Sequence, residues 1–314
     1  MLNTLAILLE KPERLSMSRL ALDAPTDGDI VVETRWSGIS TGTERLLYTG
    51  RMPEFPGMGY PLVPGYESVG VVVEAGPDTN LRAGQSVFVP GARCFGPVRG
   101  LFGGAARHLV TSASRVVPVS ESLGDKAILL ALAATALHVR AGVTPGEGDL
   151  IIGHGVLGRL LARLSVIAGG TPPTVWELNP SRAEGAEGYV VTTPDEDPRR
   201  NYRTIFDVSG DAKILDTLVA RLAPGGEIVL AGFYDTPLFF DFAPAFMREA
   251  RIRIAAQWQP ADLAHVSRLV EDGSLSLDGL ISHRRAAAQA QEAYPIAFND
   301  PSCLKMVLDW SECA

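Results

Sequence analysis

The stretch Leu150-Ile151-Ile152-Gly153-His154-Gly155-Val156-Leu157-Gly158 decides the fold of this 314-residue chain. A short apolar run leads directly into three spaced glycines, and an apolar segment of helical character follows them. This order of strand, glycine turn and helix binds the pyrophosphate of a dinucleotide. Gly153 permits the tight turn, Gly155 lets the backbone approach the phosphates, and Gly158 lets helix and strand pack closely. The stretch therefore predicts a Rossmann unit.

A carboxylate lies where the adenosine ribose of such a dinucleotide is expected. Glu177 ends the next apolar run, Val175 to Leu178, and follows Gly158 by 19 residues. A carboxylate there accepts hydrogen bonds from the ribose hydroxyls and repels a 2′-phosphate, so we expect NAD rather than NADP. Arg182 leaves some use of NADP open, because a guanidinium can bind that phosphate. We predict that the cofactor site comprises Gly153, His154, Gly155, Val156, Leu157, Gly158, Glu177, Arg182, Ser209, Gly210 and Gly232.

Two side chains near the glycine turn carry further expectations. We expect His154, inside the turn, to point its polar ring at the cofactor or at solvent. On the helix that follows the turn, Arg159 and Arg163 lie one helical turn apart. That spacing predicts that they mark a solvated face of the helix.

Helices and strands alternate on both sides of the glycine motif. Apolar runs at 204–208 and 227–232 read as strands, with a helix at 213–222 between them, and this alternation predicts a parallel sheet. The first third of the chain instead holds short β-branched runs separated by Gly and Pro, which is typical of an all-β module. We therefore predict an α/β protein with a β domain at 1–124, a dinucleotide-binding domain at 125–260, and a segment at 261–314 that returns to the first domain.

Composition limits the classes of function. Hydrophobic residues make up 46% and charged residues 20% of the chain, as in ordinary globular proteins. A net charge of -8 without a basic stripe argues against a nucleic-acid partner. The most apolar stretch, Ala127 to Val139, has 13 residues, whereas a membrane helix needs about 20, so we expect no membrane span. Cys94, Cys303 and Cys313 form no motif and no secretory start precedes them, which favours a cytoplasmic location.

Three further motifs, taken in order, resemble the medium-chain dehydrogenase/reductase superfamily. They are Pro61 to Val72, which holds Gly-Tyr-Glu where the family has Gly-His-Glu, then Leu81 to Val87, and finally Ile281 to Arg284. The resemblance implies a GroES-like β-barrel catalytic domain joined to a Rossmann domain with a doubly wound parallel sheet. It also implies NAD-dependent oxidation of an alcohol, and a homodimer formed through the edge strands near 248–255.

The departures from this family concern its metal. Zinc-dependent members bind the catalytic ion through a Cys, a His and a second Cys or an Asp, and this chain has Ser40, Tyr66 and Ala131 at those positions. Hydroxyl groups are poor ligands for zinc, which prefers thiolate and imidazole. Cys94 stands alone where many relatives hold a second zinc with four cysteines. We therefore predict no metal.

Without zinc, side chains must take the hydroxyl proton and hold the alkoxide. The resemblance places Ser40 and Thr41 on one loop of the cleft, and Tyr66 and Glu67 on another that faces it. We predict that these four residues are catalytic, with Tyr66 donating to the substrate oxygen. Glu67 would act as the base if burial raises its pKa. The alternative is that Tyr66 only packs and that Glu67 forms a structural pair.

Within the superfamily, the run Ser37 to Glu44 and the short chain resemble the branch that serves bacteriochlorophyll biosynthesis. That branch oxidises the 3-hydroxyethyl group of a chlorophyllide-type tetrapyrrole to 3-acetyl. The resemblance implies a broad, apolar substrate cleft, and candidate aromatic walls are Phe55, Tyr60, Phe95 and Phe102. Two alternatives stay open. One is a zinc-free quinone or enoyl reductase, against which Glu177 argues, and the other is a non-catalytic dinucleotide-binding protein.

Overall fold

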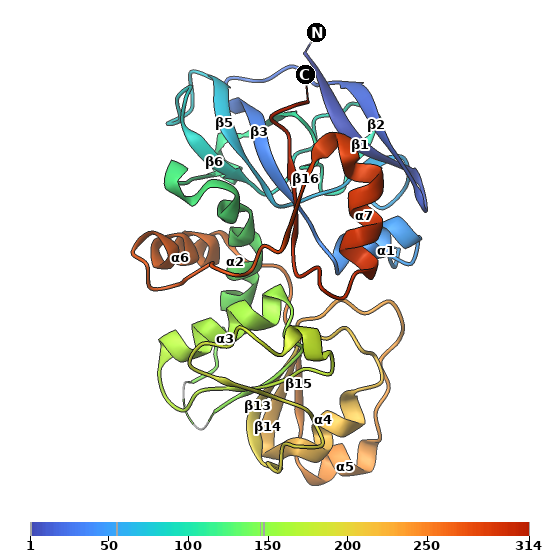
Figure 1. Ribbon diagram of the computed structural model, residues 1–314, viewed down its shortest axis with the longest axis vertical. Helices are drawn as coiled ribbons and strands as arrows, with labels where there is room; N and C mark the ends of the chain where they lie inside the picture. The colour runs from blue at the N-terminus through green and yellow to red at the C-terminus, as the bar shows by residue number, and fades with distance from the viewer. Residues whose placement is uncertain (1, 55, 145, 147, 314) are drawn as a thin grey trace. The chain divides into compact units, whose positions relative to one another are not determined.

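The computed structural model describes residues 2–54, 56–144, 146 and 148–313, and the chain divides into two compact units (Figure 1). Unit 1 comprises residues 1–131 and 280–314, and unit 2 comprises residues 132–279. The boundaries thus fall at 131/132 and 279/280, where the sequence had suggested 124/125 and 260/261. The second difference arises because the helix Pro260–Glu271 is fastened to unit 2, where Asp262 Oδ2 lies 2.8 Å from His138 Nδ1.

Unit 1 is built from two β-sheets and short helices. One sheet has the strand order β2-β1-β4-β7, and the other has the order β16-β17-β3-β5-β6-β9, with β8 also paired to β3. Its strands are β1 (Asn3–Lys11), β2 (Arg14–Ala21), β3 (Asp29–Ile39), β4 (Leu62–Val63), β5 (Ser68–Ala75), β6 (Ser86–Val89), β7 (Arg99–Gly100), β8 (His108–Ser112), β9 (Val117–Pro118), β16 (His283–Ala286) and β17 (Met306–Asp309). Its helices are α1 (Thr43–Thr49) and α7 (Ala290–Asn299).

The core of unit 1 joins both ends of its chain. Ile7 and Leu9 of β1 are fully buried together with Val32 of β3 and Leu47 of α1. β17, drawn in red, pairs antiparallel with the blue strand β3 (Figure 1). Just after it, the indole N–H of Trp310 donates a hydrogen bond of 2.8 Å to Ser37 Oγ. The C-terminal segment, residues 280–314, therefore completes the β domain of unit 1.

Unit 2 contains a six-stranded parallel sheet of order β12-β11-β10-β13-β14-β15. The order reverses direction at β10, which makes the sheet doubly wound and confirms the predicted fold class. Its strands are β10 (Leu150–Ile152), β11 (Thr174–Trp176), β12 (Val190–Thr192), β13 (Tyr202–Asp207), β14 (Leu222–Leu230) and β15 (Arg251–Ile254). Its helices are α2 (Leu130–Val139, which begins in unit 1), α3 (Val156–Ala168), α4 (Leu215–Arg221), α5 (Phe242–Met247) and α6 (Pro260–Glu271).

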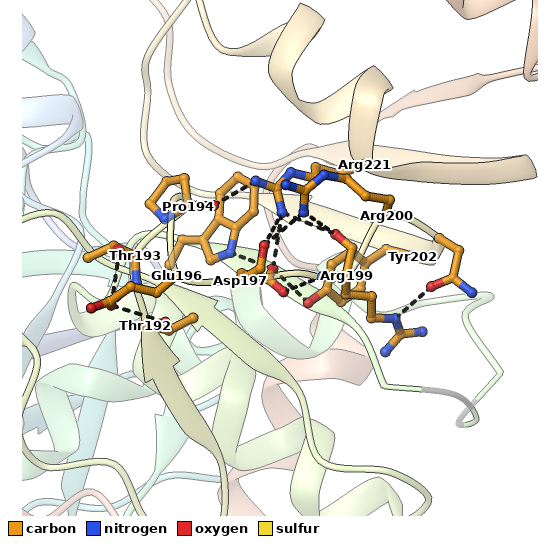
Figure 2. A network of polar contacts seen from close by, with 11 residues as sticks. Thr192, Thr193, Pro194, Glu196, Asp197, Arg199, Arg200, Tyr202 and Arg221 are labelled. Carbon is orange, nitrogen blue, oxygen red and sulfur yellow. Dashed lines mark hydrogen bonds and ion pairs between the residues drawn. The ribbon is translucent and has the colours of Figure 1, made fainter.

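Two crossovers of this sheet hold no α-helix. Among the described residues, only a 3-10 turn at Pro180–Arg182 lies between β11 and β12, and no helix lies between β12 and β13. The connection at 193–201 is a loop held by buried polar groups (Figure 2). Strand β12 itself was not predicted from the sequence.

Asp197 is the centre of that loop. Its Oδ2 accepts hydrogen bonds from the Trp176 indole N–H at 2.8 Å and from the Tyr202 hydroxyl at 2.9 Å. Arg221, at the end of α4, donates to the carbonyl oxygens of Asp197 and Pro194, both at 2.6 Å, as Figure 2 shows. The Arg221 guanidinium also lies 4.7 Å from the centre of the Trp176 ring. The network ties β11, β13 and α4 to one loop.

The two arginines of α3 do not form a solvated face, so that expectation was wrong. Arg159 is 7% and Arg163 is 8% exposed. Arg159 donates to the carbonyl oxygens of His154 at 3.1 Å and Arg182 at 3.0 Å. Arg163 donates to two carbonyl oxygens of the segment after α6, at 2.7 and 2.9 Å. Backbone carbonyls from distant loops replace the water that helical spacing alone would predict.

The most apolar segment is a core helix. α2 continues a 3-10 helix at Glu121–Leu129, and the combined segment Glu121–Val139 is long and apolar enough to cross a membrane by those criteria alone. Gly124, with φ of 54°, interrupts its helical geometry. Leu129, Leu130 and Ala133 are fully buried within the protein. Its apolar character is therefore explained by packing.

Candidate active site

The structure brings together two of the predicted catalytic side chains. Ser40 follows β3 and Tyr66 precedes β5, and the pairing of Ser37 with Ser68 in these strands aligns the two loops. Ser40 Oγ lies 2.7 Å from Tyr66 Oη, within hydrogen-bond distance. The Tyr66 ring meets the edge of Phe102 in a T-shaped contact with 5.5 Å between ring centres. Two hydroxyl groups therefore lie together at the positions where the sequence resemblance places zinc ligands in the metal-dependent members.

The surroundings of Tyr66 determine its chemistry. Burial and the nearby Glu67 carboxylate raise the pKa of Tyr66 well above its usual value, although hydrogen bonds from Ser40 and Thr43 oppose the shift. The phenol therefore stays protonated at neutral pH and is suited to donate a hydrogen bond. Thr41, on the same loop as Ser40, is exposed.

Glu67 lies in a buried ion pair with Lys305. This arrangement corresponds to the alternative given above, that Glu67 forms a structural pair. Both side chains are almost completely buried. Burial raises the pKa of Glu67, and the adjacent Lys305 opposes that shift. Gly38 passes directly over the carboxylate, so that a side chain at this position would collide with it. The sequence did not indicate Lys305, because 237 residues separate it from Glu67 and its neighbours form an apolar strand.

Sequence reasoning also missed Glu44, on the first turn of α1. Its Oε1 accepts a hydrogen bond of 3.1 Å from the Ser40 N–H, and its Oε2 accepts one of 2.8 Å from the Tyr294 hydroxyl. Burial raises the pKa of Glu44 to about 7, while the bonds from Ser40 and Tyr294 oppose the shift. The signal available was an acidic residue four positions after Ser40, and only the fold reveals that it is buried.

The predicted cofactor residues follow the carboxyl ends of four neighbouring strands of unit 2, β11, β10, β13 and β14. Gly153 has a φ of 101°, in the left-handed region that favours glycine, and a side chain at Gly158 would collide with its carbonyl oxygen. A Cβ on Gly153 would lie 3.6 Å from Ser209 Cα, and one on Gly232 would lie 2.8 Å from the Gly210 nitrogen. Gly155 caps α3 without a side-chain hydrogen bond, so N–H groups of the first turn are available to an anion.

Glu177 is fixed beside the glycine turn. Its Oε2 accepts a hydrogen bond of 2.9 Å from the His154 N–H, and its Oε1 accepts one of 2.8 Å from the Asn179 N–H. This placement suits a carboxylate that binds ribose hydroxyls. The Arg182 side chain is half-buried, and its carbonyl oxygen accepts hydrogen bonds from Arg159 and His154.

The ring of His154 faces neither solvent nor an open site, contrary to expectation. It is fully buried, with Nδ1 at 2.6 Å from the Arg182 carbonyl oxygen and Nε2 at 2.8 Å from the Tyr189 hydroxyl. Burial lowers its pKa to about 4, so the imidazole is neutral at physiological pH. His154 therefore fastens the turn at 180–182 to the glycine turn, and only its backbone lies at the predicted site.

Asp207 and Tyr234 are further members of this site that the sequence analysis missed. Asp207 Oδ1 accepts hydrogen bonds from the Ser209 N–H at 2.9 Å and hydroxyl at 2.6 Å, and its Oδ2 accepts one of 2.7 Å from the Tyr234 hydroxyl. These contacts hold the Ser209-Gly210 turn in place. An acidic residue near the end of an apolar strand was a usable signal, since buried carboxylates need such partners.

Of the aromatic residues expected to line the substrate cleft, two pack within unit 1 and one contacts Tyr66. Phe95 is buried in the core of unit 1, and the Tyr60 hydroxyl donates to the Leu47 carbonyl oxygen. Phe102 contacts Tyr66 and so belongs to the site. Phe55 lies outside the described residues.

The donors at this site do not fit zinc. Ser40 and Tyr66 offer hydroxyl oxygens, which are poor zinc ligands. Throughout the part of the chain that the structure describes, no three His, Cys, Asp or Glu side chains are grouped so that they could hold a metal ion. The absence of a required metal stays a prediction.

Comparisons with known proteins agree with this architecture. Residues 26–121 match the alcohol dehydrogenase GroES-like domain. The chain is 58% identical to 2-desacetyl-2-hydroxyethyl bacteriochlorophyllide A dehydrogenase of Rhodobacter capsulatus, with 99% of each chain covered. It is also 58% identical to the enzyme of that name from Cereibacter sphaeroides, with 100% of each covered. An alcohol dehydrogenase from Escherichia coli CFT073, solved with NADH, superposes with a TM-score of 0.83 at 22% identity and covers 98% of this chain and 99% of its own.

The fold and the full-length identity lead to one assignment. The GroES-like match lies within unit 1, and the dinucleotide-binding sheet forms unit 2. The hydroxyl pair Ser40–Tyr66 lies in unit 1. This chain therefore belongs to the 2-desacetyl-2-hydroxyethyl bacteriochlorophyllide A dehydrogenase family of the medium-chain dehydrogenases.

Proposed function

We propose that this protein oxidises the 3-hydroxyethyl group of a bacteriochlorophyllide-type macrocycle to 3-acetyl during bacteriochlorophyll biosynthesis, with NAD as the oxidant. The observation that carries the proposal is the 58% identity, over the whole chain, to two dehydrogenases whose name specifies the hydroxyethyl group.

The cofactor is held by residues of unit 2. The N–H groups at the start of α3 bind the pyrophosphate, and Glu177 binds the adenosine ribose. NAD held by these residues would supply the acceptor for the hydride of the carbinol carbon. Glu177 supports NAD rather than NADP because its carboxylate, fixed by His154 and Asn179, would repel a 2′-phosphate.

The carbinol oxygen is held by residues of unit 1. Tyr66 keeps its proton and donates a hydrogen bond to this oxygen. Ser40, paired with Tyr66, accepts a hydrogen bond from the substrate hydroxyl, and the hydroxyl proton passes to water as the hydride leaves the carbinol carbon. Glu67 acts from behind the site through its ion pair with Lys305, and the exposed Thr41 contacts the macrocycle. No metal is needed in this arrangement.

A spectroscopic assay tests the proposal. Conjugation of a new acetyl group to the macrocycle shifts its absorption to longer wavelength, so the chelator-treated protein with NAD and a 3-hydroxyethyl bacteriochlorophyllide should give a red-shifted pigment and one NADH per pigment. If the protein oxidises small secondary alcohols but leaves the macrocycle unchanged, the substrate assignment is wrong and the dehydrogenase assignment stands. If neither substrate is oxidised, the catalytic function itself is wrong.

We also infer that the protein works as a homodimer in the cytoplasm. β15 is an edge strand of its sheet, and Ile254 on it is 73% exposed. Phe242 and Met247 of the adjacent α5 are also exposed, and a second copy would cover such apolar surface. Three buried cysteines without disulfides support a reducing compartment.

A further inference from the structure

Glu44 holds the main chain of Ser40 from both sides. The Ser40 N–H donates to Glu44 Oε1 at 3.1 Å, and the Glu44 N–H donates to the Ser40 carbonyl oxygen, also at 3.1 Å. The Ser40 hydroxyl, in turn, lies 2.7 Å from Tyr66 Oη. Any shift of the Glu44 carboxyl therefore moves one partner of the Ser40–Tyr66 pair.

The second oxygen of Glu44 is fixed by α7. Tyr294 donates to Glu44 Oε2 at 2.8 Å, and its ring packs against Tyr48 and Phe298, with 6.3 and 5.6 Å between ring centres. Burial raises the pKa of Tyr294, so this hydroxyl stays protonated. Both groups hydrogen-bonded to the carboxyl are thus donors, an arrangement that suits an ionised carboxylate. A protonated carboxyl would require one of them to turn away.

The groups around Glu44 place its change between the protonated and the ionised form near neutral pH. Glu67 and Lys305 face it from the loop before β5 and from the segment before β17, and Tyr66 and Tyr294 face it as neutral hydroxyls. Lys305 is already paired with Glu67. One lysine thus serves two buried carboxylates, and burial raises the pKa of Glu44 to about 7.

We propose that Glu44 is a positioning residue of the dehydrogenase site, whose ionised carboxylate fixes Ser40 against Tyr66 during turnover. The proposal rests on the function proposed above. Charge-assisted hydrogen bonds are roughly twice as strong as neutral ones, so protonation of Glu44 loosens its hold on the Ser40 main chain. A displacement of about 1 Å at a reacting group can reduce turnover by about 100-fold.

The test is the pH dependence of kcat in four proteins. Wild-type kcat should fall as the pH drops through about 7, where Glu44 takes up a proton. Glu44→Gln keeps the shape and one acceptor oxygen but cannot ionise, so kcat should be about 10- to 100-fold lower with no acid limb near 7. Tyr294→Phe removes a bond that stabilises the ionised form, so its acid limb should move to higher pH. Tyr48→Phe removes a neighbouring hydroxyl outside the network and should match wild type.

A second readout does not depend on activity. Difference infrared spectra should show a protonated carboxyl band that titrates near pH 7 in wild type and is missing in Glu44→Gln, with thermal unfolding confirming that the variant folds. If Glu44→Gln retains the wild-type kcat or its acid limb, the proposal is overturned. If wild type does not oxidise the macrocycle, the proposed substrate is wrong. The same pH series, run with a small alcohol that the protein does oxidise, then decides the role of Glu44.

Discussion

Ser40 and Tyr66 form a hydrogen-bonded pair of hydroxyls backed by buried carboxylates. Replacing Tyr66 by Phe removes one donor and leaves the ring packed on Phe102. We expect kcat to fall by about 100-fold with little change in KM, because loss of one donor to a developing alkoxide costs about this much. Steady-state kinetics on the macrocycle would show it. Tyr60→Phe, which removes a hydroxyl bonded to a backbone carbonyl elsewhere, is the matched control, and equal activity of wild type and Tyr66→Phe would contradict the assignment.

The proposed preference for NAD rests on Glu177. Glu177→Gln keeps the acceptor oxygen near the glycine turn but removes the charge that repels a 2′-phosphate. We expect the variant to bind NADP at least about 10-fold more tightly than wild type does. NAD binding should weaken, because hydrogen bonds to a charged group are worth about 1.5 to 3 kcal/mol. Titration of each cofactor by calorimetry measures both effects. Glu184→Gln, at an exposed acid of the same connection, should change neither. A native protein that prefers NADP would refute this role.

Glu44 also predicts how stability depends on pH. Its pKa is about 7 in the folded protein against 4.5 for the free side chain. Because the pKa is higher in the folded protein than in the unfolded chain, folding favours the protonated carboxyl. The stabilisation that results is complete below about pH 4.5 and is lost as the pH rises through 7. Glu44→Gln does not titrate, so the stability of wild type relative to this variant should fall by up to about 3 kcal/mol between pH 4.5 and 8. Chemical denaturation at several pH values measures this, and a constant difference would contradict it.

At the level of single residues, the sequence predicts those whose role depends on local spacing. Gly153 has the left-handed backbone and Gly158 the close helix–strand approach that the sequence predicted, because three spaced glycines after an apolar strand determine that geometry. Lys305 and Tyr294 could not be found, because each reaches its carboxylate partner from the far end of the chain. The buried ring of His154 was missed because its partner Tyr189 comes from the next connection of the sheet.

Among the elements, the loop at 193–201 takes the place of a crossover helix and depends on Asp197. Asp197→Asn leaves the buried Arg221 without its counter-charge and turns one acceptor into a donor that faces other donors. We expect unit 2 to lose about 3 kcal/mol of stability, as when a buried charge pair is broken. Thermal unfolding and amide hydrogen exchange of the loop measure this loss.

A surface acid in the same loop provides the control for Asp197. Glu196 accepts hydrogen bonds from Thr192 and Thr193 at the surface. Glu196→Gln should change stability by no more than about 0.5 kcal/mol. Equal stability of the Asp197 and Glu196 variants would show that the network is not what holds the loop.

The elements themselves were predicted unevenly. Strand β10, helix α3 and helix α4 lie close to their expected positions, because their apolar periodicity is local. Strand β12 was not foreseen, and the loop at 193–201 rests on tertiary contacts of Trp176 and Arg221. Periodicity cannot report such contacts.

For the whole molecule, the edge of the parallel sheet is the surface that we propose for assembly. Ile254→Arg places a charge on the exposed edge strand β15, where a second copy would pair. We expect the variant to sediment as a monomer while wild type sediments as a dimer, because burying an unpaired charge costs several kcal/mol. Analytical ultracentrifugation distinguishes the two. Val73→Arg, at an exposed position of unit 1, is the control and should not change the mass.

The position of β17 inside the sheet of unit 1 has a consequence for synthesis on the ribosome. Residues 132–279 leave as one continuous segment and hold all that unit 2 needs, whereas β3 must wait for a strand that is made some 270 residues later. At roughly 5 to 20 residues per second, the stretch from 280 to 310 takes roughly 2 to 6 seconds. During that interval the part of β3 that pairs with β17, Trp36–Ile39, has one open edge and Glu67 lacks its lysine, so this half of the newborn chain is the one that a chaperone would have to protect.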